Sequence, residues 1–172
     1  MTPSNEPAVT VIRAFASADW AQLWPILQAT NQGGDTFAFA PDSSESDMQH
    51  AWIDVPAATF VACAEDGSLL GSYFLKPNQP GLGSHVCNAG YVVAHAARGR
   101  GTAAAMCEHS QREASARGFL AMQFNFVVST NERAVRLWKR MGFVVIGTVP
   151  SGFRHRALGL VDALIMYKPL TS

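Results

Sequence analysis

A glycine-rich segment that opens a helix directly after an apolar strand is the feature that most constrains this chain. It reads Arg98-Gly99-Arg100-Gly101-Thr102-Ala103-Ala104 and follows a strand expected at 85–93. A helix start exposes unpaired main-chain N–H groups at the positive end of the helix dipole, and glycines let a ligand approach the main chain closely. We therefore expect an anion site here, most naturally for phosphate; a plain strand-to-helix turn is the simpler alternative.

Two familiar phosphate motifs do not explain this segment. Gly99-x-Gly101-x-x-Ala104 matches the dinucleotide fingerprint, but five residues separate the strand from the first glycine. About twenty residues further on, where that fingerprint needs an acid for a ribose, residues 123–126 supply none. No Gly-Lys-Ser/Thr follows, so a P-loop is excluded. A pyrophosphate cradle of another kind remains.

Periodicity along the chain predicts alternating strands and helices in one unit. We find no repeat, low-complexity tract or linker, so we expect a single mixed α/β domain over residues 1–172. Helices are expected at 17–30, 42–52, 102–117 and 131–141. Strands are expected at 9–14, 59–64, 69–76, 85–93, 121–128, 143–149 and 160–167.

Charge and composition exclude several classes of protein. The 13 basic and 13 acidic residues cancel, which argues against a nucleic-acid scaffold, yet residues 1–95 hold nine acids and two bases while residues 96–172 hold eleven bases and four acids. The three cysteines are odd in number and lie in apolar segments, as buried thiols of a reducing compartment do. A polar start and the lack of eighteen consecutive apolar residues predict a soluble, cytoplasmic protein that does not enter a membrane. His, Cys and acidic residues do not cluster with metal-ligand spacing, so we expect no metal.

Two motifs resemble those of the GNAT superfamily of N-acetyltransferases. Residues 98–103 are similar to its [QR]-x-x-G-x-[GA] signature, and Asn131-x-x-Ala134-x-x-Leu137-Trp138-x-x-x-Gly142-Phe143 is similar to its second motif. The resemblance implies the GNAT fold: a mixed, mostly antiparallel sheet of about seven strands, splayed near the middle and flanked by about four helices.

The resemblance also implies direct transfer of an acetyl group from acetyl-CoA to an amine in a ternary complex. The main-chain N–H near Val93 would polarise the thioester carbonyl, and the pyrophosphate would lie on the N–H groups of residues 100–104. Many relatives pair as homodimers, so a homodimer is expected as well. The residues expected to hold acetyl-CoA are Val92, Val93, Arg98, Gly99, Arg100, Gly101, Thr102, Ala103, Ala104, Asn131, Ala134, Leu137 and Trp138.

The chain departs from the family at two catalytic positions. Members often carry a Glu on the strand before the glycine loop, but residues 87–91 hold no carboxylate. The Tyr that commonly protonates the leaving thiolate is replaced by Trp138, whose indole N–H is only a donor. We expect proton removal through water, with Asn88, Asn125, His155 and the acids of the 35–47 loop as candidates to assist it. We expect Asn131 to hydrogen-bond the pantetheine or sulfur region; as a plain alternative, Asn131 caps its helix.

The acceptor amine is expected to meet polar side chains on the strands beside the splay. Asn88 and Asn125 lie mid-strand, where Asn is disfavoured, so they either face the cleft and hold the acceptor's polar group or form a satisfied cross-strand pair. Phe37 and Phe39 either wall the acceptor pocket or belong to the core, and His155 is a further candidate. The acids of the 35–47 loop favour a cationic small acceptor, although a solvated helix start explains them equally well.

A narrower resemblance concerns residues 125–131, 149–155 and 161–167. They look like a GNAT subgroup that includes fungal acetyltransferases acting on proline analogues such as azetidine-2-carboxylate. We therefore expect an acetyl-CoA-dependent N-acetyltransferase acting on a primary or secondary amine of a small molecule such as an amino acid. Three alternatives stay open: a protein or peptide N-acetyltransferase, a non-catalytic acyl-CoA-binding sensor, and a nicotinamide oxidoreductase.

Overall fold

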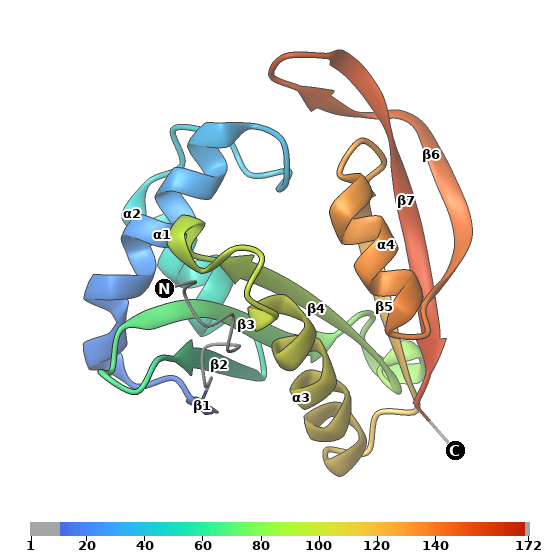
Figure 1. Ribbon diagram of the computed structural model, residues 1–172. Helices are drawn as coiled ribbons and strands as arrows, with labels where there is room; N and C mark the ends of the chain where they lie inside the picture. The colour runs from blue at the N-terminus through green and yellow to red at the C-terminus, as the bar shows by residue number, and fades with distance from the viewer. Residues whose placement is uncertain (1–10, 171–172) are drawn as a thin grey trace, which may run out of the picture.

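A seven-stranded sheet organises the chain in the computed structural model, which describes residues 11–170 (Figure 1). The strand order is β1-β2-β3-β4-β5-β7-β6, and every neighbouring pair is antiparallel except β4 and β5. The expected mixed, mostly antiparallel sheet is confirmed. Its strands are β1 Val11–Ala14, β2 Ala58–Cys63, β3 Leu69–Pro77, β4 Val86–Val93, β5 Ala121–Val128, β6 Val144–His155 and β7 Gly159–Pro169.

Four α-helices in the described residues follow the expected segments. They are α1 Trp20–Gly33, α2 Glu45–Gln49, α3 Thr102–Ala116 and α4 Glu132–Arg140. Helix α1 ends where Gly34 takes a left-handed conformation, and the hydroxyl of Ser44 caps α2 by accepting the Asp47 N–H at 3.1 Å. A π-helical turn at His50–Asp54 continues α2, so the second expected helix is formed in two parts. The first expected strand begins at Val11; its residues 9 and 10 lie outside the described part of the chain.

Apolar side chains form one cluster on each face of the central strands. On one face, Tyr73 of β3 and Met122 of β5 pack against Met106 and Cys107 of α3. On the other face, residues such as Phe74 pack against α1, α2 and the π-helical turn. The adjacent residues Tyr73 and Phe74 therefore belong to different clusters, as the two-residue period of a strand requires.

The sheet opens between β4 and β5. Their parallel ladder contains only three pairs, Val86 with Ala121, Cys87 with Met122 and Asn88 with Gln123. Beyond Asn88 the two strands diverge, and the ribbon shows β4 running toward α1 while β5 runs beside α4 (Figure 1). The expected splay near the middle of the sheet thus lies directly after Asn88.

The last hairpin extends further than the sequence pattern indicates. Strand β6 continues past Pro150 to His155, although the pattern predicts its end at residue 149. The register between β6 and β7 shifts between Val149 and Phe153, and Ser151 lies there with a φ of 52°. A bulge therefore absorbs the Pro-Ser-Gly segment, and the strand resumes beyond it.

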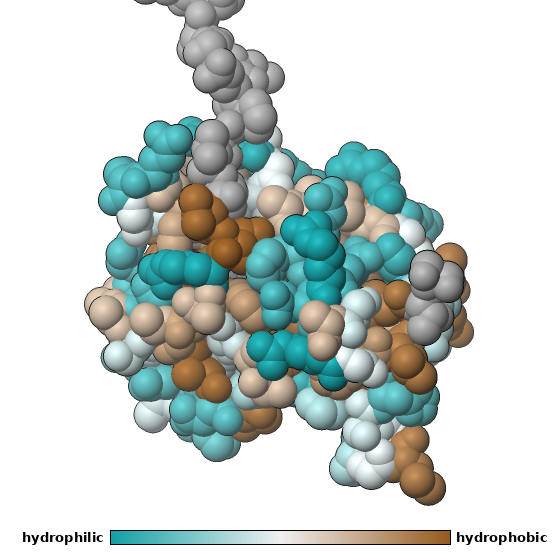
Figure 2. Space-filling view, turned by 90° about the horizontal axis from the view of Figure 1, so that it is seen from below, coloured by the Kyte–Doolittle hydropathy of each residue, from teal (hydrophilic) through white to brown (hydrophobic). Residues whose placement is uncertain are grey.

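The underside of the molecule is a mixture of hydrophilic and apolar surface. Figure 2 shows this face with hydrophilic side chains across its centre and apolar atoms in separate patches. Among residues 11–170, no helix is long and apolar enough to cross a membrane.

Candidate active site

A cleft of about 660 Å³ lies at the splay of the sheet, between the β4–α3 connection and α4. It brings together residues that are far apart in the sequence. Every residue expected to hold acetyl-CoA lines it except Arg100. The expected acceptor residue His155 lines it too, whereas Phe37, Phe39, Asn88 and Asn125 do not.

The start of α3 forms one wall of the cleft. Gly99 and Gly101 have φ angles of 79° and 80°, which favour glycine, and Gly101 occupies the cap position without offering a side chain to the helix. A Cβ atom built on Gly101 would meet nothing within 4 Å. The hydroxyl of Thr102 is buried without a hydrogen-bond partner among the described residues. This helix start therefore keeps unpaired donors around a space that is open to a ligand.

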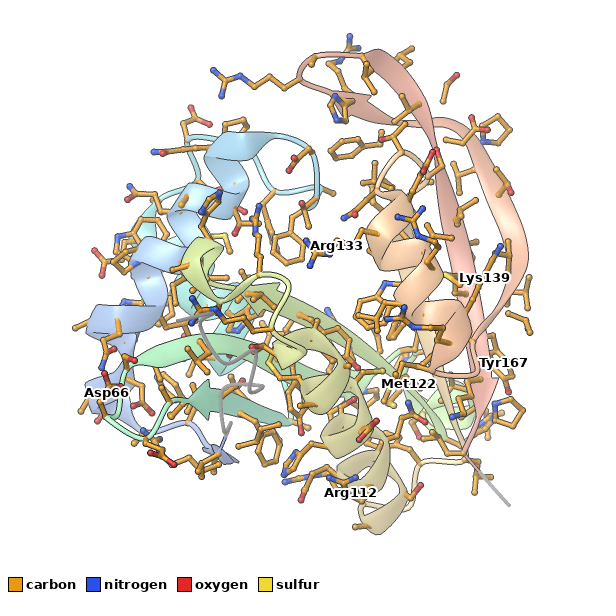
Figure 3. The ribbon with its side chains drawn as sticks, viewed as in Figure 1. Asp66, Arg112, Met122, Arg133, Lys139 and Tyr167 are labelled. Carbon is orange, nitrogen blue, oxygen red and sulfur yellow. The ribbon has the colours of Figure 1, made fainter. Side chains whose placement is uncertain are left out.

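Helix α4 forms the opposite wall. Asn131 caps it, because its Oδ1 accepts the Ala134 N–H at 3.2 Å. The Arg133 side chain reaches from this helix into the space between the two halves of the sheet (Figure 3). Four arginines line the cleft in all, and they are Arg98, Arg133, Arg136 and Arg140.

The floor of the cleft is the end of β4, with Tyr91, Val92 and Val93. The Ala94 N–H donates to Leu70 O of β3 at 2.8 Å. Successive N–H groups of a strand point to opposite edges, so the N–H of Val93 points away from β3, toward the splay. This is the direction in which a main-chain donor could polarise a bound carbonyl.

The hydroxyl of Tyr91 is held beneath the cleft floor. The Ser110 hydroxyl donates to Cys107 O at 2.8 Å, so Tyr91 Oη donates in turn to Ser110 Oγ at 2.6 Å. Burial raises the pKa of Tyr91 well above its usual value. Its proton is thus engaged in the core. Trp138, stacked obliquely on Tyr91 at 5.0 Å between ring centroids, has no titratable group to replace it.

The far end of the cleft is closed by two loops that meet. The Arg156 N–H donates to Gly34 O at 3.0 Å, and Arg156 Nη1 donates to Gln32 O at 2.7 Å. These bonds, which we call the clasp, join the end of α1 to the turn between β6 and β7. Asp35 follows Gly34, His155 precedes Arg156, and both line the cleft.

The two expected amides lie at and beyond the apex of the splay. Asn88 Nδ2 donates to Gln123 O at 3.0 Å, across the last pair of the β4–β5 ladder. Asn125 is exposed; its Nδ2 donates to Asn78 Oδ1 at 2.6 Å, and its Oδ1 accepts from Gln123 Nε2 at 3.0 Å. Asn88 therefore makes a cross-strand bond, the structural alternative considered from the sequence, whereas Asn125 bonds within its own strand and to the segment after β3. Each amide retains capacity for a further partner.

Phe37 and Phe39 pack on the apolar cluster of the α1–α2 face. The Phe37 ring meets Trp52 edge to face at 5.6 Å between centroids and lies 5.9 Å from the Phe39 ring. Both are partly buried. They anchor the α1–α2 loop, of which they are part, on this cluster, and Trp52 in turn contacts Phe74.

The three cysteines are buried, free thiols. Burial raises the pKa of Cys87 to about 12 and that of Cys107 to about 11, and it also raises the pKa of Cys63. These thiols are protonated at neutral pH and lie in the core, as expected. Within residues 11–170 no three His, Cys, Asp or Glu residues are grouped to hold a metal ion.

Sequence reasoning missed several lining residues. Thr30, Thr36, Ala97 and Thr130 carry no motif, and only the tertiary fold brings them to the cleft. Tyr91 could have been found, because it lies on the strand that leads to the glycine loop. Asp35 was recognised only as one of several loop acids.

Comparison with known proteins gives a consistent result. The sequence model of the acetyltransferase (GNAT) family matches residues 20–143. The chain is 37% identical over 99 residues to N-acetyltransferase aca1 of Schizosaccharomyces pombe, a match that covers 57% of this chain and 47% of that protein. The chain therefore spans about half the length of this curated relative.

Solved structures share the fold over nearly the whole chain. A GCN5-related N-acetyltransferase from Kribbella flavida is 40% identical, with a TM-score of 0.90 and coverage of 95% of this chain and 99% of that one. A phosphinothricin acetyltransferase from Sinorhizobium meliloti, solved with acetyl-CoA, has a TM-score of 0.84 at 18% identity, covering 93% and 88% of the two chains. At that identity the second likeness concerns the fold alone.

Proposed function

The chain belongs to the acetyltransferase (GNAT) family, and we propose that it transfers an acetyl group from acetyl-CoA to the amine of a small molecule such as an amino acid. The observation that carries this proposal is the α3 helix start facing the arginines of α4 across one cleft. A pyrophosphate needs both unpaired main-chain donors and cations, and the cleft supplies both.

The residues of the cleft suit acetyl-CoA as a co-substrate. The space beside Gly101 and the unpartnered Thr102 hydroxyl fit a phosphate oxygen at the helix start. Arg98 and Arg133 would neutralise the pyrophosphate, and Arg136 and Arg140 lie further along α4 for remaining phosphate charge. Val92, Val93, Asn131 and Trp138 would then contact the pantetheine arm between the strands.

The chemistry is aminolysis of a thioester. The neutral amine nitrogen attacks the acetyl carbonyl carbon, the carbon–sulfur bond breaks, and CoA leaves as a thiolate. The Val93 N–H would stabilise the oxyanion; one such donor is typically worth roughly 10²- to 10³-fold in rate. The amine loses its proton to water, and the thiolate gains one from solvent, because Tyr91 is engaged with Ser110 and Trp138 does not titrate.

Asn88 and Asn125 flank the apex of the splay outside the cleft lining, where they could bind a polar group of the acceptor other than its reacting amine. Each amide keeps a free donor or acceptor for a polar group of the acceptor. Phe37 and Phe39 act through the loop that carries Asp35 rather than by lining the cleft. The subgroup resemblance makes proline analogues the first acceptors to test.

Two other functions lead to different observations. A protein or peptide N-acetyltransferase would acetylate N-terminal peptides in preference to free amino acids. An acyl-CoA sensor, favoured by the absent strand Glu and the Trp at position 138, would bind acetyl-CoA without releasing thiol. The nicotinamide oxidoreductase considered from the sequence loses its basis, because the glycine segment belongs to the matched acetyltransferase region.

Residues 1–172 are proposed to form one acetyltransferase domain, and a homodimer stays a prediction. Edge strand β6 carries Val144 and Ile146 with 57% and 55% of their surface exposed, and it is where a second copy would pair. Light scattering of the protein in solution tests this prediction.

The experiment that tests the function is an acceptor screen by thiol release. The panel contains proline analogues, amino acids, polyamines and N-terminal peptides, each incubated with acetyl-CoA, and acetylated products are identified by mass spectrometry. Release with small amines supports the proposal. Release with peptides alone, or acetyl-CoA binding without any release, would replace it with one of the two alternatives.

A further inference from the structure

The end of the cleft closed by the clasp holds a carboxylate, Asp35, as well as the guanidinium group of Arg156. Asp35 is the one carboxylate among the described residues that line the cleft. The Thr36 hydroxyl donates to its Oδ1 at 3.0 Å, which leaves Oδ2 available. Asp35 could therefore pair with an ammonium group, while Arg156, bound through Nη1 to Gln32 O, and Arg98, which lines a neighbouring pocket with Asp35, carry positive charge nearby.

The turn between β6 and β7 sets the tautomer of the His155 imidazole. Nδ1 accepts main-chain N–H bonds from Ala157 at 3.0 Å and Leu158 at 3.1 Å. A neutral imidazole that accepts at Nδ1 carries its proton on Nε2. The ring therefore presents an N–H donor at its distal end, and it cannot accept a proton there while it is neutral. This arrangement suits recognition of an anion or a carbonyl and does not suit a general base.

The clasp brings these two groups to one place. Asp35 and His155 are each one residue away from the Gly34–Arg156 main-chain bond, and consecutive Cα atoms lie about 3.8 Å apart. Arg156 also holds Gln32 O at the end of α1, so the turn and the helix are joined at two points. The main chains of Asp35 and His155 are thereby brought close together, and a carboxylate and an N–H donor line the same cleft.

We propose that Asp35 and His155 recognise the two charged groups of a zwitterionic acceptor, an α-amino acid. Asp35 pairs with its ammonium before that group loses a proton and reacts, and His155 Nε2–H donates to its carboxylate. This inference rests on the proposed acetyltransferase function and narrows the acceptor from any small amine to one that carries a carboxylate.

Two substitutions of His155 separate recognition from a structural role. His155→Asn keeps an acceptor where Nδ1 stands and so preserves the turn, but it removes the distal donor. His155→Gln reaches the distal position with an amide N–H and gives up the bonds to the turn. His85→Asn, at an exposed position away from the cleft, serves as the control.

The measurement is kcat/KM for thiol release with an amino acid and with its carboxamide, which lacks the anionic group. The wild type is expected to prefer the amino acid. His155→Asn should lose about 10- to 100-fold with the amino acid and little with the carboxamide, because a hydrogen bond to a charged group is lost. His155→Gln should retain more activity than His155→Asn. The reverse order, or equal losses with both acceptors, would overturn the proposal.

Asp35→Asn tests the other half of the pair, with Asp42→Asn of the same loop as its control. The acceptor KM should rise about tenfold or more, while the dissociation constant of acetyl-CoA, measured by calorimetry without acceptor, stays unchanged. An effect on acetyl-CoA alone would assign the pair to the co-substrate and overturn the inference.

Failure of the function and failure of the pair give different results. If the wild type releases no thiol with any acceptor, the proposed transfer is wrong. Calorimetric titration of the amino acid into the acetyl-CoA-loaded protein then still tests the pair. Equal affinity for wild type and His155→Asn would overturn it, and weaker binding to the variant would support it.

Discussion

The main-chain N–H of Arg156 donates to the carbonyl of Gly34 at 3.0 Å, joining the β6–β7 turn to the end of α1. Helix α1 packs on the β1–β4 half of the sheet, and the turn belongs to the β5–β7 half. The two halves are therefore joined by the short β4–β5 ladder and again by this bond.

Gly34→Ala should weaken the hydrogen bonds of the clasp. Its φ of 65° already disfavours a side chain, and a Cβ atom would lie 2.9 Å from Arg156 Cβ. Gly67→Ala is the matched control, since Gly67 has a φ of 84° but nothing within 4 Å. Gly67→Ala should lower the free energy of unfolding by roughly 1–2 kcal/mol through backbone strain, and Gly34→Ala should lower it further because Arg156 must shift. Only Gly34→Ala should also raise the acceptor KM; equal kinetics in the two variants would show that the clasp does not shape the acceptor site.

Asn88→Ala should raise the KM of the acceptor far more than that of acetyl-CoA. The substitution removes the 3.0 Å bond to Gln123 O at the last pair before the splay, together with the amide oxygen offered to an acceptor. Initial rates measured while each substrate is varied in turn check this. If the acceptor kinetics do not change, Asn88 has only the cross-strand role.

Asp19 gives the fold a pH dependence. Arg13 donates to both of its carboxylate oxygens at 2.8 Å, and these bonds together with the Ala16 N–H lower the pKa of Asp19 below its ordinary 3.8. A lowered carboxyl pKa stabilises the fold above the ordinary value, and the contribution disappears as the pH falls through the folded-state value. Asp19→Asn should cost about 1–2 kcal/mol of unfolding free energy at neutral pH.

Urea unfolding from pH 7 down to pH 3 measures this effect. The difference between wild type and Asp19→Asn should shrink below about pH 4. Asp42→Asn, in an exposed loop, controls for the loss of one charge. A difference that stays constant with pH would contradict the assigned role of the Arg13–Asp19 pair.

The arginines of the cleft predict a salt effect on co-substrate binding. The KM of acetyl-CoA should rise with ionic strength, because attraction between phosphates and exposed guanidinium groups is screened beyond roughly 8 Å at physiological salt. Arg136→Gln should weaken that dependence, while Arg112→Gln, at the far end of α3 (Figure 3), should not. A KM that ignores salt would show that the basic half of the chain does not attract the phosphates.

The elements could be predicted from sequence wherever hydrophobic period and end signals agreed. Helix α3, between Gly101 and Gly118, and strand β5 are such cases. The sequence predicts an early end for strand β6 because Pro150 and Gly152 normally end a strand. The strand continues beyond the bulge because it pairs with β7 there. Residues with a motif at a helix start, such as Gly101 at α3 and Asn131 at α4, are predicted to share one site, and both line the cleft.

The acceptor end could not be predicted in the same way. The Gly34–Arg156 bond links segments separated by most of the chain, and neither residue carries a local signal for the other. Asn88 and Asn125 are candidates from the sequence because amides are disfavoured in strands. Neither lines the cleft, and no sequence pattern reveals that the β4–β5 ladder ends at Asn88.

Gly101→Asp tests whether the helix start at Gly101 binds acetyl-CoA for transfer. A carboxylate at Gly101 would occupy the open space at the helix start and repel phosphate, whereas Gly118→Asp imposes similar backbone strain, with a φ of 87°, at the other end of α3. The measurement is thiol release together with formation of acetylated acceptor. We expect both in the wild type and in Gly118→Asp and neither in Gly101→Asp. Unchanged acetyl-CoA affinity and turnover in Gly101→Asp would contradict the account.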